Sequence, residues 1–150
     1  MAPAATLGAL GRLAGRWVGS EILHSLSGVE PERKAQGCFS NRIFEARFLI
    51  NDYEQSVDGE IVFRGHGVYG FDPGSGRYSM YWIDSQGGAV GPIVAGDLEA
   101  NRLVFLRQGA GGATRYAYTF EGPGGFRFEL SVSLDGRTFR PVLAGRYEKR

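Results

Sequence analysis

The chain is poor in the side chains from which many metal and catalytic sites are built. It has one cysteine, Cys38, and two histidines, His24 and His66. A single thiol excludes an internal disulfide and makes a poor metal site. The carboxylates show no calcium-loop spacing, and no histidine suits the base of a serine hydrolase. We therefore expect neither a bound metal nor a nucleophilic triad.

Charge of one sign and long apolar runs are also missing. The net charge is +1, so no strong electrostatic field would recruit nucleic acid or an anionic membrane. The first 15 residues, MAPAATLGALGRLAG, lack both a basic start and a continuous apolar core. No apolar run is long enough to span a bilayer as a helix. We expect a cytoplasmic protein that binds neither nucleic acid nor membrane.

Helical periodicity is confined to the first residues. Leu7, Leu10 and Leu13 recur at three-residue spacing, with Thr6 as the candidate cap, which predicts a short helical turn within 6–14. Glycine is abundant, at 24 of 150 residues, and is dispersed as in closely packed strands with tight turns. The length suits a single domain, 1–150, in which 1–14 form an N-terminal helical cap and 15–150 form a barrel.

From residue 16 onward the apolar pattern has period two, which indicates strands. About ten antiparallel strands joined by short hairpins predict an all-β fold. A single up-and-down β-barrel is favoured over a sandwich, which would need longer crossovers. The predicted strands cover 16–26, 34–44, 47–57, 60–71, 77–85, 91–99, 102–108, 113–121, 125–134 and 138–148.

The tight turns predict which residues of neighbouring strands pair. A two-residue turn at Asp58-Gly59 pairs Val57 with Glu60, and therefore Asp52 with Gly65. A four-residue turn after Asp72 pairs Gly67 with Trp82, and Gly65 with Asp84. The same reasoning at three other turns pairs Ile43 with Phe48, Leu98 with Leu103, Val132 with Phe139 and Phe128 with Leu143.

One face of each strand is apolar, and we expect that face to line the barrel. Gly67 opposite Trp82 fits this arrangement, because a residue without Cβ leaves room for an indole. The outer face would then carry His66 and most of the arginines, together with Asn51 and Gln55. The inner face would include Phe48, Ile50, Asp52 and Glu54 of the third strand.

Two sets of motifs resemble known barrels. Gly15-Arg16-Trp17 is similar to the Gly-x-Trp opening of the calycin group, which includes lipocalins, fatty-acid-binding proteins and nitrobindins. A longer series resembles, in order and spacing, a bacterial calycin-like family known as domain of unknown function 1579. The likeness covers roughly residues 13–107 and implies a ten-stranded lipocalin-like barrel with an internal cavity and no established activity. Its motifs are Asp52-Tyr53-Glu54, Phe63-Arg64-Gly65-His66-Gly67, Gly70-Phe71-Asp72 and Trp82-x-Asp84.

Nitrobindins, the more distant resemblance, are haem barrels whose iron ligand is a histidine late in the chain. Here no histidine follows His66, and His66 falls on the predicted outer face. The resemblance therefore does not extend to haem, and we expect no cofactor.

The predicted pairing places Asp52 and Asp84 on either side of Gly65, both facing inward, with Glu54 one step along. Their Cα atoms would lie about 10 Å apart across two strand spacings. Carboxylates in an apolar cavity need polar partners. The candidates on the inner face are Arg107, Asn41 and the hydroxyls of Tyr69, Tyr116 and Tyr118. The row would serve as a polar anchor for a ligand or as a general acid/base pair, unless it is a structural ion-pair cluster.

Three interpretations of function follow, and the residues alone do not decide whether the protein is an enzyme. The first is the binding of a small hydrophobic or amphipathic molecule inside the barrel. The second is acid/base catalysis on an apolar small molecule by Asp52 and Asp84, with Glu54 as a further candidate. The third is a filled barrel that forms a homodimer across an outer patch of Tyr53, Val62, His66, Val68 and Tyr81. The predicted ligand contacts are Trp17, Phe39, Asn41, Asp52, Phe63, Gly65, Gly67, Tyr69, Trp82, Asp84, Phe105, Arg107, Tyr116 and Tyr118.

Overall fold

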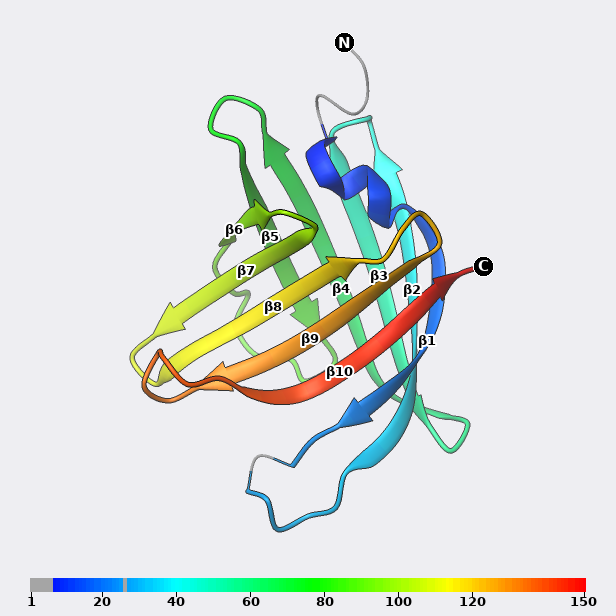
Figure 1. Ribbon diagram of the computed structural model, residues 1–150, viewed down its shortest axis with the longest axis vertical. Helices are drawn as coiled ribbons and strands as arrows, with labels where there is room; N and C mark the ends of the chain where they lie inside the picture. Colours follow the sequence, from blue (N-terminus) through cyan, green and yellow to red (C-terminus); the bar gives the residue numbers. More distant parts are fainter. Residues whose placement is uncertain (1–6, 26) are drawn as a thin grey trace.

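Ten antiparallel strands form one closed barrel in the computed structural model, which describes residues 7–25 and 27–150 (Figure 1). Each strand pairs with the next in sequence, and the first pairs with the last to close the ring. The predicted fold class is therefore confirmed. The strands are β1 (Gly15–Leu23), β2 (Arg33–Phe44), β3 (Phe48–Val57), β4 (Glu60–Asp72), β5 (Arg77–Asp84), β6 (Val94–Glu99), β7 (Arg102–Gly109), β8 (Gly112–Phe120), β9 (Gly125–Ser133) and β10 (Arg140–Lys149).

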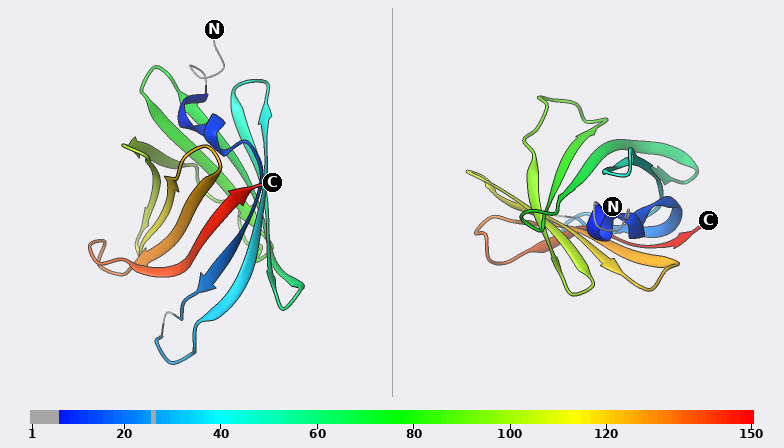
Figure 2. Two further views of the ribbon diagram at one scale, coloured as in Figure 1. Left: turned by 45° about the vertical axis from the view of Figure 1, so that its right-hand side comes forward. Right: turned by 90° about the horizontal axis from the view of Figure 1, so that it is seen from above.

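A 3-10 helix, η1 (Gly8–Leu13), covers one end of the barrel, and Figure 2 shows it within the ring of strands seen from above. Its leucines are buried in the same core as Trp17. The Leu13 carbonyl oxygen accepts hydrogen bonds from Trp17 Nε1 at 2.9 Å and from Asn41 Nδ2 at 2.8 Å. The predicted helical turn is thus present, and its predicted cap, Thr6, lies outside the described residues.

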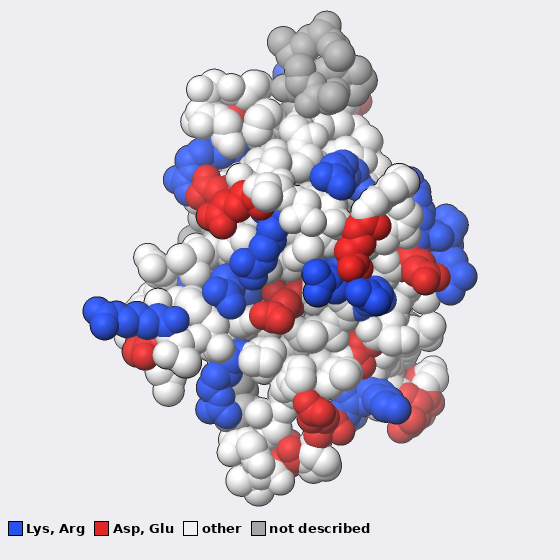
Figure 3. Space-filling view, in the orientation of Figure 1, with Lys and Arg blue, Asp and Glu red and all other residues white. Residues whose placement is uncertain are grey.

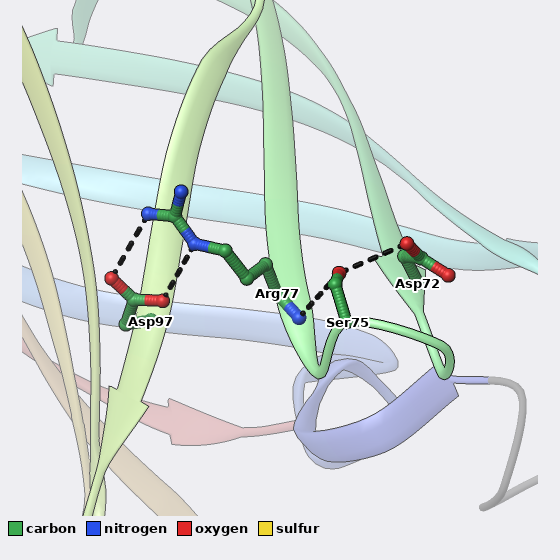
Figure 4. A network of polar contacts seen from close by, with 4 residues as sticks. All are labelled: Asp72, Ser75, Arg77 and Asp97. Carbon is green, nitrogen blue, oxygen red and sulfur yellow. Dashed lines mark hydrogen bonds and ion pairs between the residues drawn. The ribbon is translucent and has the colours of Figure 1, made fainter.

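The turn between β4 and β5 is held by its own side chains (Figure 4). Asp72 accepts hydrogen bonds from the Gly74 backbone N–H and the Ser75 hydroxyl, each at 2.9 Å. Arg77, the first residue of β5, forms a two-pronged ion pair with Asp97 of β6, at 3.0 and 3.1 Å. These contacts fix the predicted pairing of Asp72 with Arg77, and with it the pairing of Gly67 with Trp82 and Gly65 with Asp84.

The pairing of β3 differs from the prediction by one residue. The connection from β2 has three residues, Glu45 to Arg47, and not two, so Phe44 and not Ile43 lies opposite Phe48. A β-bulge between Gln55 and Ser56 then restores the predicted pairing at the far end of β3. Between these two irregularities every side chain of β3 points to the face opposite the predicted one. Leu49, Asn51, Tyr53 and Gln55 are therefore buried inside the barrel.

Asp52 and Glu54 consequently face solvent, and the prediction that they point inward is wrong. Asp52 Oδ1 lies 2.8 Å from Nδ1 of His66, and Glu54 Oε2 lies 3.0 Å from Nε of Arg64. Tyr53, not Asp52, is opposite Gly65. The predicted inward row of two carboxylates does not form, and the same reversal removes Tyr53 from the predicted outer patch.

The pairing of β9 with β10 was also predicted incorrectly. Val132 lies opposite Arg140, and an irregularity between Pro141 and Leu143 brings Leu143 opposite Leu130. Phe139 precedes β10 and packs against the guanidinium of Arg115, 4.2 Å from its ring centroid, so it is not part of the barrel lining. The predicted pairing of Leu98 with Leu103 is confirmed.

Charges of both signs are interspersed on the face of the molecule that Figure 3 shows. Arg127 and Arg146 share one carboxylate, Glu121, at 3.2 and 3.0 Å. Within the described ranges, no helix has the length and hydropathy needed to cross a bilayer.

Candidate ligand cavity

A cavity of about 710 Å³ occupies the barrel on the side away from η1. The ends of β5 and β7 and the loop that follows β5 form its mouth. Aromatic rings dominate its wall, and a few polar groups converge on it, which is the usual character of a small-molecule site. The lining residues include Leu23, His24, Phe39, Tyr53, Gln55, Phe63, Tyr69, Met80, Trp82, Asp84, Gln86–Gly91, Arg107, Thr114, Tyr116, Tyr118, Phe128, Leu130 and Leu143.

The indole of Trp82 forms part of this wall and lies against two positions of β4 that have no side chain, Gly65 and Gly67. A Cβ atom at Gly65 would lie 2.1 Å from Trp82 Cζ2, and one at Gly67 would lie 3.0 Å from Trp82 Cε3. Only glycine allows the ring to lie this close to the β4 backbone. The two glycines therefore make room for the ring that borders the cavity.

Asp84 faces inward, as predicted, and it positions its neighbours. Its Oδ2 accepts a hydrogen bond from Trp82 Nε1 at 2.9 Å, and its Oδ1 accepts one from the Gln86 backbone N–H at 2.9 Å. The two carboxylate oxygens thus fix the orientation of the indole and the start of the loop at the cavity mouth.

Arg107 is the cation of the cavity. It lies exposed near the end of β7 and is adjacent to the Tyr116 hydroxyl. Burial raises the pKa of Tyr116, the charge and hydrogen bond of Arg107 oppose that rise, and the charge of Asp84 adds to it. No ion pair joins Arg107 to a carboxylate within residues 7–25 and 27–150. Its guanidinium is accordingly available to an anionic group of a ligand.

Two tyrosines from different walls of the barrel line the cavity and meet through their hydroxyl groups. The hydroxyls of Tyr69 on β4 and Tyr118 on β8 are 2.7 Å apart. Burial raises the pKa of each, and for Tyr118 the neighbouring Tyr69 raises it further. Both therefore remain neutral hydrogen-bonding groups at ordinary pH.

A buried carboxylate that the sequence interpretation missed lies beside the cavity. Glu21 is 1% exposed and accepts hydrogen bonds from Tyr53 at 2.7 and 2.9 Å, Tyr147 at 2.5 Å and Gln55 Nε2 at 3.0 Å. Burial, and then the charge of Glu21, raise the pKa values of Tyr53 and Tyr147, which keeps both as hydrogen-bond donors. The signal for Glu21 was its spacing, because positions 17, 19 and 21 of one strand share the face of Trp17.

Glycines also enclose this cluster. A Cβ atom at Gly37 would lie 2.1 Å from Glu21 Oε2, and one at Gly145 would lie 2.3 Å from the Tyr147 hydroxyl oxygen. The backbone of β2 and β10 is thus shaped around the carboxylate and its tyrosine partner. Hydrogen bonds from Tyr53, Tyr147 and Gln55 to both oxygens of Glu21 are how a barrel interior can accommodate a carboxylate.

The structure distributes the predicted ligand contacts over several places. Trp17 and Asn41 lie under η1, and Phe105 is fully buried against Tyr69. Gly65 and Gly67 lie behind the indole, and Asp52 borders a shallow depression on the outer surface beside His66. Which residues contact a ligand remains a prediction. Those that line the cavity are Phe39, Phe63, Tyr69, Trp82, Asp84, Arg107, Tyr116 and Tyr118.

The two histidines lie apart. His24 borders the cavity mouth and pairs through Nδ1 with Glu32 Oε2 at 2.5 Å, whereas His66 is outside the barrel with Asp52. In the described part of the chain, no three side chains of the types His, Cys, Asp and Glu come together as metal ligands would.

Comparison with solved structures shows similar barrels at low sequence identity. The crystal structure of Rv2717c from M. tuberculosis superposes with a TM-score of 0.74 at 16% identity, over 100% of this chain and 99% of that chain. The S-type phycobiliprotein lyase CPES from Guillardia theta gives a TM-score of 0.64 at 12% identity, over 93% and 89%. EF1p2_mFAP2b bound to DFHBI gives 0.52 at 13% identity, over 95% and 97%. Such identities establish the fold alone.

Comparison of sequences identifies the family. None of the curated proteins matches the chain. The model of one family, described as "Protein of unknown function (DUF1579)", matches residues 3–122, and because this match spans most of the chain, the protein belongs to that family.

Proposed function

We propose that the barrel binds a small amphipathic molecule, with an apolar body against the aromatic wall and a polar, anionic end at Arg107. The observation that carries this proposal is the cavity of about 710 Å³, which opens to solvent beside a cation. A barrel of this class either fills its interior with its own side chains or holds one small ligand. Here the side chains leave the volume open.

The similar barrels support a ligand of this kind. One of them was solved bound to the small molecule DFHBI, and another is a phycobiliprotein lyase. At 12–13% identity these proteins do not identify the ligand of this chain, so the chemistry of the ligand rests on the cavity wall.

The test is a titration with an apolar fluorescent probe, N-phenyl-1-naphthylamine, whose emission rises in apolar surroundings. The variant Leu130→Trp places an indole in the cavity and should weaken probe binding about tenfold or more, since the probe loses volume and contact area. The matched control is Leu106→Trp, because Leu106 is exposed on the outer face of β7. Binding that survives Leu130→Trp unchanged would contradict the proposal.

The anionic end is tested with 8-anilinonaphthalene-1-sulfonate, which has the same aromatic body and an added sulfonate. Arg107→Gln should weaken binding of the sulfonate probe roughly fivefold, as expected for an exposed cation, and leave the neutral probe unaffected. Arg42→Gln, on the exposed outer face of β2, is the control for a general change in charge. An equal effect on the two probes would refute the anchoring role of Arg107 without affecting the cavity proposal.

Two alternative functions, acid/base catalysis by Asp52 and Asp84 and dimerisation through the outer patch, have less support than ligand binding. Asp52 points outward to His66, whereas both carboxylate oxygens of Asp84 accept hydrogen bonds from Trp82 and Gln86, so the inward-facing pair of carboxylates that the catalytic alternative needs is not formed. For a dimer, Val62, His66, Val68 and Tyr81 do lie on the outer face, without Tyr53. Light scattering across a concentration series tests that interface, and a constant monomer mass would exclude it.

A further inference from the structure

Gln55 is a buried amide side chain in the cavity wall. It is 7% exposed, lies on the inner face of β3 and borders the cavity. Its Nε2 group has two hydrogens and two acceptors, Glu21 Oε1 at 3.0 Å and the Tyr53 hydroxyl oxygen at 3.0 Å. Both N–H bonds of the amide are therefore directed toward the Glu21 cluster.

This orientation of the amide cannot be reversed. Rotation by 180° would set Gln55 Oε1 against the Glu21 carboxylate, so that two acceptors would face each other in a buried place and two hydrogen bonds would be lost. Tyr53 cannot relieve this conflict, because its single hydroxyl proton already goes to Glu21. The buried carboxylate thus decides which end of the Gln55 amide is left for other partners.

The end of the Gln55 amide that remains for other partners is its carbonyl oxygen, a hydrogen-bond acceptor. Gln55 Oε1 receives no hydrogen bond from the residues that the structure describes. Nor is it sealed in protein without a partner, a condition found at Asn51 Oδ1 deeper in the barrel. A carbonyl oxygen that is not sealed in protein, on an otherwise immobilised side chain that borders the cavity, is a preorganised hydrogen-bond acceptor.

We propose that Glu21 fixes the Gln55 amide so that its carbonyl oxygen accepts a hydrogen bond from an N–H or O–H group of the bound molecule. The inference rests on the proposed function and narrows the ligand class to amphipathic molecules that carry a hydrogen-bond donor on the apolar body and an anionic group at the mouth. Gln55 is the residue that contacts the ligand. Glu21, which acts through it, is a positioning residue.

Three probes of the same size and shape separate donor from acceptor. Carbazole carries an N–H donor, dibenzofuran replaces that group with an ether oxygen, and 9-fluorenone carries a carbonyl acceptor. Each is used to displace N-phenyl-1-naphthylamine from the wild-type protein. Carbazole should compete about five- to tenfold better than dibenzofuran, the effect of one buried hydrogen bond, and 9-fluorenone should compete worst.

Two variants test the residues. Gln55→Met keeps the length of the side chain and removes the acceptor, so carbazole and dibenzofuran should become equal within about twofold. Glu21→Gln allows the Gln55 amide to turn, so the carbazole preference should shrink and 9-fluorenone should gain. A merely structural role of Glu21 would weaken all three probes together. Gln36→Met, on the exposed outer face of β2, is the control.

The outcomes separate this inference from the proposed function. If the reporter binds but wild-type protein does not prefer carbazole, or if the preference survives Gln55→Met, the inference is wrong and the cavity proposal stands. If the reporter does not bind at all, the cavity proposal itself fails. Should Glu21→Gln fail to fold, as judged by circular dichroism, Gln55→Met alone decides between these outcomes.

Discussion

The indole of Trp82 lies directly against the backbone of Gly65, with no room for a side chain between them. A Cβ atom at Gly65 would be 2.1 Å from Trp82 Cζ2 and 2.4 Å from Cη2, well inside van der Waals contact. The far side of this indole borders the cavity. The shape of the cavity therefore depends on the absence of one methyl group.

Gly65→Ala should displace the indole or distort β4, at a cost of about 2 kcal/mol in the free energy of unfolding. Urea unfolding measures the cost, and near-ultraviolet circular dichroism reports the ring. The control is Gly109→Ala on β7, where no atom lies within 4 Å of the added Cβ and stability should change by less than about 0.5 kcal/mol. Equal stabilities for the two variants would contradict the close packing of Trp82 on Gly65.

The two aspartates that the sequence interpretation paired should behave differently when each is changed to asparagine. Asp52→Asn disrupts only an exposed contact with His66, so stability should change by less than about 1 kcal/mol and probe affinity not at all. Asp84→Asn leaves either Trp82 Nε1 or the Gln86 N–H without its acceptor, so probe affinity should fall about threefold or more. The reverse order would place Asp52 inside the barrel.

Strand order, strand extents and the glycine–indole contact were predictable from the sequence because they depend on local signals. Alternation of apolar residues marks a strand, and the turn at Asp72–Arg77 has side chains that fix its own geometry. Gly65, Gly67, Trp82 and Asp84 were therefore placed correctly on the inner face.

Which side chains of β3 point into the barrel was not predictable in the same way. Its reversal arises from one extra loop residue, with Glu45 and Ala46 at φ of 53° and 56°, and from one bulge at Gln55. Neither feature has the glycine or proline that usually marks such a place. Because Asp52, Tyr53, Glu54 and Gln55 are all polar or amphipathic, their pattern does not show which face is buried. The reversed assignment of β3 placed Tyr53 and Gln55 on the outer face, so the predicted ligand contacts did not include them.

Asn41 provides a contrast between the two ends of the barrel. Its Nδ2 donates to the Leu13 carbonyl oxygen, and its Oδ1 accepts from Asn51, so it ties η1 to the strands. Asn41→Ala should lower the free energy of unfolding by about 2 kcal/mol, since two buried hydrogen bonds are lost. Probe affinity should stay within about twofold of wild type, because Asn41 does not border the cavity. A large loss of affinity would mean that the cavity extends to η1.

Stability at alkaline pH should depend on the tyrosines buried in and beside the cavity. Burial raises the pKa values of Tyr53, Tyr69, Tyr118 and Tyr147 above the ordinary value near 10. Below pH 10 these groups are neutral in both the folded and unfolded chain, so their contribution is fully present. Above pH 10 the unfolded chain ionises first, and the free energy of unfolding should fall by about 1.4 kcal/mol per pH unit for each tyrosine that stays neutral in the fold.

The measurement is urea unfolding at several pH values between 8 and 11.5, with tyrosinate absorbance at 295 nm recorded on the folded protein. Tyr69→Phe should make the free energy of unfolding fall less steeply with pH above pH 10, by the contribution of one tyrosine, because phenylalanine has no ionisable group in either state. The folded protein should show tyrosinate absorbance from these four residues only as it unfolds. A stability that stays flat to pH 11 would mean that the four hydroxyls ionise as readily inside the barrel as in the unfolded chain.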